Sequence, residues 1–251
     1  MTNTQTSTTA PSGPAERTST VHVVLVPGFW LGAWAWDRVL PGLRAAGLEP
    51  HALTLPGLEA PDADRSQVTF DDHVRAVLDV VAGLDGDVVL VGHSGGGMVV
   101  QHVLDRAVDR VRRVVYVDSG PLSAGRAIDP SATGVDHPLP SWDELAAQGS
   151  SMEGMDDELR AEIARRAVPH PARVASAEAD PRDPRRLSVP ATIICTSIPS
   201  GAVQGMFGSG VIPAEVPDMT DVTYVDLPTG HWPMLSRPDD LAAAIAAAAL
   251  G

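Results

Sequence analysis

The sequence predicts a doubly wound α/β fold, in which helices cover both faces of a mostly parallel sheet. Short β-branched runs alternate with helical segments, and most of these runs are continuously apolar, as strands are when both faces are buried. The 251 residues, 44% of them hydrophobic, allow one large core without disulfide staples. A small disulfide scaffold and a wholly disordered chain are therefore excluded.

Six apolar runs are the expected strands. All are short and most are rich in β-branched residues, and they span residues 21–26, 51–55, 87–91, 113–117, 191–195 and 222–227.

Helical patterns separate several of these runs. Between residues 74 and 81, apolar side chains recur at the i, i+3, i+4 and i+7 positions of one helix face. Thr69 and Asp72 precede them at the spacing of a capping box, which predicts that a helix begins after Thr69. Residues 98–104 form a second helical run, directly after a glycine-rich turn.

The two ends of the chain differ in composition. Residues 1–20 are crowded with Thr and Ser and carry no apolar run, which favours a disordered tail over a secretory signal. Residues 241–250 form the longest apolar run, about half of the ~20 residues that span a bilayer. They predict a buried C-terminal helix, and Ser236 with Asp239 indicates an N-cap at its start.

Residues 120–187 interrupt the alternation. They contain no convincing strand, but helical patterns lie at 141–148 and 155–167. Because both ends of this stretch return to the same sheet, we expect an inserted helical cap, with residues 21–119 and 188–251 as the core.

Charge and residue usage exclude several classes of protein. The formal charge of −14 would repel phosphate backbones and anionic lipid, so we expect neither nucleic acid nor a membrane as a partner. All 18 basic residues are Arg, which excludes chemistry that needs a lysine amine. The single cysteine, Cys195, fits a reducing compartment, and we expect a cytoplasmic protein, either a monomer or a homodimer, that acts on a small molecule.

The sharpest motif is Gly92-His93-Ser94-Gly95-Gly96-Gly97, between an apolar strand and a helical run. In a G-x-S-x-G elbow, the glycines permit a tight strand-to-helix turn that exposes the serine hydroxyl. The motif predicts Ser94 as a nucleophile. No G-x-G-x-x-G register fits these glycines, so dinucleotide binding is a poorer interpretation.

A nucleophilic serine needs a base and donors for an oxyanion. His231, in the Gly230-His231-Trp232 segment after the last expected strand, is the candidate base. The backbone N–H groups of Phe29, in the turn after the first strand, and of Gly95, after the nucleophile, are the candidate oxyanion donors. The histidines show no metal-ligand spacing.

Several segments together resemble the α/β-hydrolase superfamily. They are Val24-Leu25-Val26-Pro27-Gly28-Phe29-Trp30, Gly32-Ala33-Trp34-Ala35-Trp36, Leu53-Thr54-Leu55-Pro56-Gly57, the elbow, Val115-Tyr116-Val117-Asp118 and Gly230-His231-Trp232-Pro233-Met234. Within the superfamily, the chain is similar to EstC-type bacterial esterases and to plant methylesterases and hydroxynitrile lyases. The resemblance implies the α/β-hydrolase fold with an eight-strand-type sheet, a helical cap over a Ser-His-acid site, and no metal or organic cofactor.

The chain departs from the pattern of these relatives in three places. The entry turn carries Pro27-Gly28 where relatives usually have His-Gly, and the lysine on which hydroxynitrile lyases rely is absent. The acid that normally follows the penultimate strand is also missing, since residues 196–210 hold no Asp or Glu.

The missing acid leaves several candidates. Asp118, at the end of an earlier strand, is the best, because some superfamily members are similar in placing their acid there. Four other carboxylates rank behind it: Glu215, Asp218, Asp221 and Asp226.

These residues predict a serine hydrolase that cleaves a small carboxylic ester or lactone through an acyl-enzyme, with Ser94, His231 and Asp118 as a triad. Apolar side chains are expected to shape its substrate pocket: Trp30, Trp142, Met152, Met155, Met206, Phe207 and Trp232. Two alternatives stay open. One is a non-hydrolytic enzyme of natural-product metabolism, such as a cyclase, lyase or acyl-transfer enzyme. The other is a catalytically silent ligand-binding protein.

Overall fold

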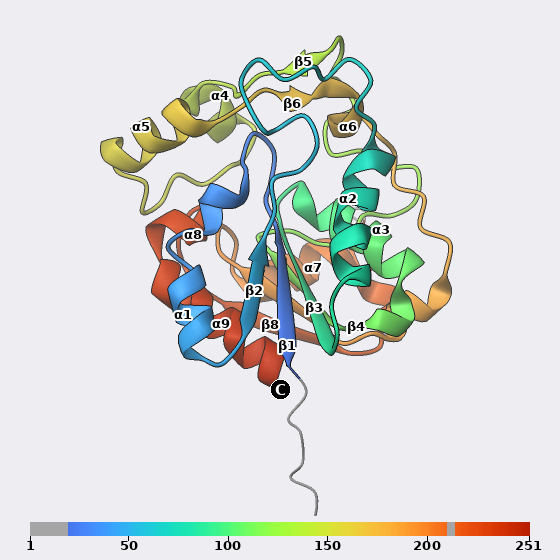
Figure 1. Cartoon of the computed structure of the whole chain (residues 1–251). Coiled ribbons are helices and arrows are strands. Elements are labelled where there is room, and N and C mark those ends of the chain that lie inside the picture. The colour runs from blue at the N-terminus through green and yellow to red at the C-terminus, as the bar shows by residue number, and fades with distance from the viewer. Residues whose placement is uncertain (1–19, 210–213) are drawn as a thin grey trace, which may run out of the picture.

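Six parallel strands form the central sheet of the computed structural model, which describes residues 20–209 and 214–251 (Figure 1). The strand order is β2-β1-β3-β4-β7-β8. The strands are β1 (Val21–Val26), β2 (Glu49–Ala52), β3 (Asp87–His93), β4 (Val111–Val117), β7 (Ala191–Cys195) and β8 (Val222–Asp226). The tail expected at residues 1–20 lies outside the described residues, apart from Thr20.

All six expected strands are confirmed, with differences at their ends. β1 and β7 match the expected bounds, whereas β2 begins at Glu49 and ends at Ala52, three residues before the expected end. The Leu53 N–H still donates to the Leu25 carbonyl at 3.1 Å before the chain leaves the sheet. The resemblance implies an eight-strand-type sheet, but the central sheet has six strands among the described residues.

Helices cover both faces of the sheet. The helices α1 (Leu40–Ala45), α8 (Pro233–Ser236) and α9 (Pro238–Leu250) lie on one face, and α2 (Phe70–Ala82) and α3 (Gly96–Arg106) on the other. α7 (Ser200–Gly208) packs with the second group. Short 3₁₀ turns complete the core at η1 (Ala33–Trp36), η2 (Val108–Arg110), η3 (Pro184–Ser188) and η4 (Val216–Asp218).

Two helix starts test the expected caps. The capping box of α2 is confirmed, because Thr69 and Asp72 each accept the other's backbone N–H. The expected N-cap at Ser236 is wrong. Ser236 ends α8 and its hydroxyl donates to the Trp232 carbonyl, while Pro238 opens α9 with a φ angle already suited to a helix.

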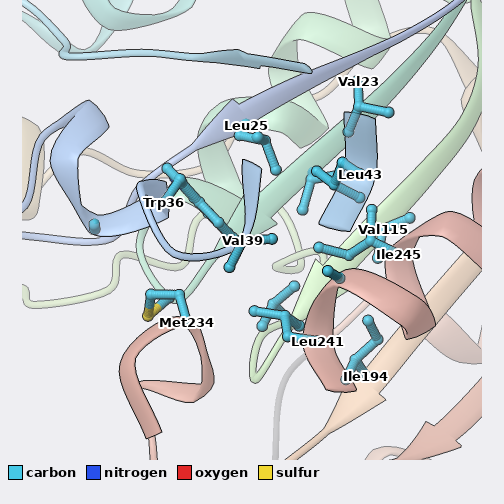
Figure 2. Packing of buried hydrophobic residues seen from close by; sticks show 14 of the residues in the cluster. Val23, Leu25, Trp36, Val39, Leu43, Val115, Ile194, Met234, Leu241 and Ile245 are labelled. Carbon is cyan, nitrogen blue, oxygen red and sulfur yellow. The ribbon is translucent and has the colours of Figure 1, made fainter. Parts of the chain in front are cut away.

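Alternate residues of each strand enter two separate apolar layers. Val23 and Leu25 of β1 belong to the layer under α1 and α9, whereas Val24 and Val26 belong to the layer under α2 and α3. Figure 2 shows the first layer, in which Leu241 and other side chains of α9 meet side chains of β1, β4 and α1. Burial on both faces explains why β1 and β7 are apolar almost throughout, whereas the edge strands β2 and β8 carry exposed polar residues.

Residues 120–187 contain α4 (Trp142–Ala147), α5 (Asp157–Arg166) and α6 (Ala172–Ala175), which lie beyond the carboxyl ends of the strands (Figure 1). The expectation of no strand here is wrong, since β5 (Asp136–His137) and β6 (His170–Pro171) form an antiparallel pair. Two-residue strands are too short to leave an alternating pattern in a sequence.

Leu241→Ala is expected to lower the free energy of unfolding by about 2–5 kcal/mol, because the side chain is fully buried and its loss leaves a cavity. Urea unfolding would measure the change. Leu250→Ala is the matched control in the same helix, because Leu250 is 54% exposed and should cost less than about 1 kcal/mol. Equal losses in the two variants would contradict the packing described for α9.

Candidate active site

Ser94 lies in a strained turn between β3 and α3. Its φ angle is +49°, a left-handed conformation that a non-glycine residue adopts only when the surrounding structure enforces it. The Ser94 N–H donates to the Val117 carbonyl at 3.1 Å, which ties the turn to the end of β4. At Gly92, an added Cβ would lie 2.7 Å from the Gly96 carbonyl oxygen, so the turn requires glycine there.

Three polar side chains from distant parts of the chain form a continuous hydrogen-bonded series. His231 Nε2 lies 2.8 Å from Ser94 Oγ, and His231 Nδ1 lies 2.6 Å from Asp118 Oδ2. Because an ionised carboxylate can only accept, Nδ1 carries the proton and donates to Asp118. Nε2 is then free to accept the hydroxyl proton of Ser94, so the geometry suits proton transfer from serine to histidine.

Asp118 follows β4 with a φ angle of +45°. Its Oδ1 accepts the N–H groups of Thr196 at 3.3 Å and Ser197 at 3.0 Å, and the Ser197 hydroxyl donates to Oδ2 at 2.7 Å. Burial by itself would raise the pKa of Asp118, but the hydrogen bonds from His231 and Ser197 and the nearby imidazole outweigh it. The pKa is therefore lowered well below its usual range, and the carboxylate stays ionised beside the histidine.

The other candidate acids lie elsewhere. Glu215 pairs with Arg186 and accepts a hydrogen bond from Gln101 at 2.8 Å, and Asp226 accepts the Ser200 N–H at 2.7 Å and the Ser200 hydroxyl at 2.8 Å. In the described part of the chain, Asp118 is the carboxylate that bonds the His231 ring, whereas Asp218 and Asp221 do not.

The two expected oxyanion donors are neighbours. A Cβ built at Gly95 would lie 2.5 Å from the Phe29 ring, so the turn after β1 lies directly against the elbow. Within residues 20–209 and 214–251, neither the Phe29 nor the Gly95 N–H donates to a protein acceptor. Both N–H groups are therefore unengaged, as donors to an oxyanion must be before substrate binds.

His93 contacts His231 and Ser197 contacts Asp118, and sequence reasoning assigned a role to neither. The buried His93 ring donates from Nε2 to the His231 carbonyl at 2.7 Å, and burial lowers the pKa of His93 to about 3, so the ring is neutral. Its place within the elbow motif is a signal that could have found it. A serine after a strand, such as Ser197, has no comparable signal, because its role depends on a contact across the sheet.

A cavity of about 290 Å³ opens beside His231 and Asp118. Of the side chains expected to shape a pocket, Phe207 lines it, and the described lining contains none of the other six. Trp232 is buried between Trp142 and His231, with ring centroids at 5.7 and 5.0 Å.

The remaining expected pocket residues have other surroundings. Met155 is buried in the core under α9, and Met152 packs against the same core. The Trp30 indole donates to the His137 carbonyl at 2.9 Å. Met206 of α7 is half-buried.

Residues 20–209 and 214–251 contain no group of three or more His, Cys, Asp or Glu side chains arranged to hold a metal ion. In the same ranges, no helix combines the length and apolar composition that crossing a bilayer requires.

Part of the chain is similar in sequence to known proteins. Over 109 residues, the chain is 38% identical to Esterase PIR7B of Oryza sativa subsp. japonica, and over 100 residues it is 37% identical to a carbendazim hydrolyzing esterase of Nocardioides sp.. These segments cover 42% and 39% of this chain, and 41% of each relative's length.

Solved structures resemble the whole described domain. An extracellular α/β-hydrolase from a Paenibacillus species has a TM-score of 0.71 at 20% identity, covering 91% of this chain and 98% of that one. The methylesterase MES16 of Arabidopsis has a TM-score of 0.68 at 22% identity, covering 90% and 97%. At these identities the likeness shows a shared fold.

A family model described as the alpha/beta hydrolase family matches residues 23–244, which include the elbow, Asp118 and His231. The match extends over most of the chain and agrees with the parallel sheet and with the structural likeness. The chain therefore belongs to the α/β-hydrolase family.

Proposed function

We propose that the protein is a serine hydrolase that cleaves a small carboxylic ester or lactone. The observation that carries this proposal is the hydrogen-bonded series from Ser94 through His231 to Asp118, beside two unengaged backbone N–H groups. The esterase names of the relatives that match part of the chain support it.

In the proposed reaction, Ser94 Oγ attacks the carbonyl carbon while His231 Nε2 takes the hydroxyl proton. The carbonyl oxygen becomes an oxyanion that accepts hydrogen bonds from the N–H groups of Phe29 and Gly95. When the bond to the alcohol oxygen breaks, His231 returns the proton to that oxygen. An acyl-Ser94 intermediate remains.

Water completes the cycle by the same proton path. His231 Nε2 takes a proton from the attacking water, and the proton returns to Ser94 Oγ as the acid leaves. Asp118 holds the His231 ring with Nδ1 protonated and stabilises the imidazolium that forms in each half of the cycle. With a lactone, the released alcohol stays attached to the acyl group and one hydroxy acid is the product.

Ser94→Ala is expected to abolish covalent labelling by a fluorophosphonate and to lower kcat for a susceptible ester by about 10⁶-fold, because no nucleophile remains. Intact mass spectrometry would measure labelling, with Ser131→Ala as a control at an exposed serine outside the cavity lining. Absence of labelling in the folded wild-type protein would contradict the proposed function and favour the ligand-binding or non-hydrolytic alternative.

Asp118→Asn is expected to lower kcat by about 10³–10⁴-fold with little change in KM, because an amide can donate to Nδ1 and favours the wrong tautomer of His231. Asp226→Asn is the matched control at the end of β8, where the carboxylate bonds Ser200 and not His231. Loss of activity in Asp226→Asn alone would contradict the assignment of Asp118.

Ser197→Ala is expected to slow both kcat and Ser94 labelling by about tenfold, because it removes one hydrogen bond to the Asp118 carboxylate. Ser197→Thr keeps the hydroxyl and should restore most of the rate. If the two variants lose the same activity, Ser197 does not act through Asp118.

A further inference from the structure

Two cavities of unequal size adjoin the candidate catalytic residues or the oxyanion donors, whereas a third, of about 380 Å³, is lined by residues within 139–142 and 164–169 and by none of these groups. The cavity of about 290 Å³ adjoins His231 and Asp118, whereas a cavity of about 10 Å³ adjoins Phe29, Gly95 and His170 on the oxyanion side. The smaller one has room for about one water molecule. The larger one is about twice the volume of a ~150 Å³ cavity that binds benzene.

The larger cavity is suited to an uncharged, apolar group. Ile194, Ile198, Val203 and Phe207 form much of its wall, and among its described lining residues Asp118 and His231 are the only acidic or basic side chains apart from a thiol. Burial raises the pKa of that thiol, Cys195, to about 12, so it is neutral. Both oxygens of Asp118 already accept hydrogen bonds from His231, Thr196 and Ser197, which leaves no ready partner for a ligand cation.

The chemistry decides which half of an ester meets which cavity. The carbonyl oxygen points to the N–H groups of Phe29 and Gly95, so the alcohol oxygen must lie near His231 Nε2, from which it takes its proton. A group attached to the alcohol oxygen therefore extends toward the wall that contains His231. That wall bounds the larger cavity.

We propose that the larger cavity binds the alcohol part of the substrate, as an apolar group of up to about ten carbons such as a fused pair of rings. This inference rests on the proposed hydrolase function. It deepens that function by defining the substrates as esters of bulky, uncharged, apolar alcohols.

Two isomeric esters test this orientation without a difference in composition. 2-Naphthylmethyl acetate carries the rings on its alcohol, and methyl 2-naphthylacetate carries them on its acyl group; neither has an activated leaving group. For the wild-type protein, kcat/KM is expected to be at least tenfold higher for 2-naphthylmethyl acetate. A preference for methyl 2-naphthylacetate would overturn the assignment.

Substitutions that fill the cavity from two different walls test whether the alcohol part binds there. Val203→Phe on α7 and Ser150→Phe after α4 each place a ring into the cavity. Each variant is expected to lower kcat/KM for 2-naphthylmethyl acetate by at least tenfold. The value of kcat/KM for ethyl acetate should change less than about twofold. Two independent walls keep the test valid if one variant does not fold. Val135→Phe is the matched control, because Val135 is exposed and lies outside the cavity lining.

Fluorophosphonate labelling of Ser94 distinguishes failure of the alcohol-site proposal from failure of the hydrolase proposal. If labelling is intact but the filled variants lose activity equally toward 2-naphthylmethyl acetate and ethyl acetate, the cavity is not the alcohol site and the hydrolase proposal stands. If the folded wild-type protein is not labelled, the hydrolase proposal fails and the alcohol site fails with it.

Discussion

The hydrogen bond between His231 Nδ1 and Asp118 Oδ2, at 2.6 Å, is the contact on which the arrangement of the site depends. It joins the end of β4 to the loop after β8, with β7 between these strands in the sheet. Parallel strands end at the same edge, so residues more than a hundred positions apart can meet there. The backbone of Thr196 and Ser197, which follow β7, fills the space between by donating to the same carboxylate.

Backbone strain is concentrated at this edge of the sheet. In the described ranges, the non-glycine residues with positive φ are Trp30, Ser94 and Asp118, and each follows the end of a parallel strand. Such conformations cost about 1–3 kcal/mol each and persist only when packing enforces them. The apolar layers on both faces of the sheet provide that enforcement, since they hold the strands in register behind the site. The strained conformation of the partly buried Ser94 thus depends on the stability of the core behind it.

Local sequence determined much of the fold. The apolar runs predict all six strands, most clearly β1 and β7, because strands buried on both faces are apolar almost throughout. The capping box at Thr69 and Asp72 marks the start of α2, since both partners lie within one helical turn. The elbow around Ser94 is recognised from its local G-x-S-x-G spacing, although Gly95, Gly96 and Gly97 lie against residues from other segments of the chain. Ser236, by contrast, shows that a cap pattern fails when a nearby proline starts the helix instead.

Tertiary structure decided what depends on contacts between distant segments. Glu215 and Asp226 match Asp118 in charge, but Arg186 and Ser200 engage them elsewhere, and no sequence spacing reports those partners. Contacts between distant segments also produce the hydrogen bond from Ser197 to Asp118, the contact of neutral His93 with His231, and the lining of the larger cavity. Most of the Trp and Met residues expected in a pocket lie outside this lining. An apolar side chain is expected to be buried, but its type does not show which residues it packs against. The sequence by itself therefore determined the strands and the nucleophile turn, while the folded sheet brought the histidine, its carboxylate and the cavity together.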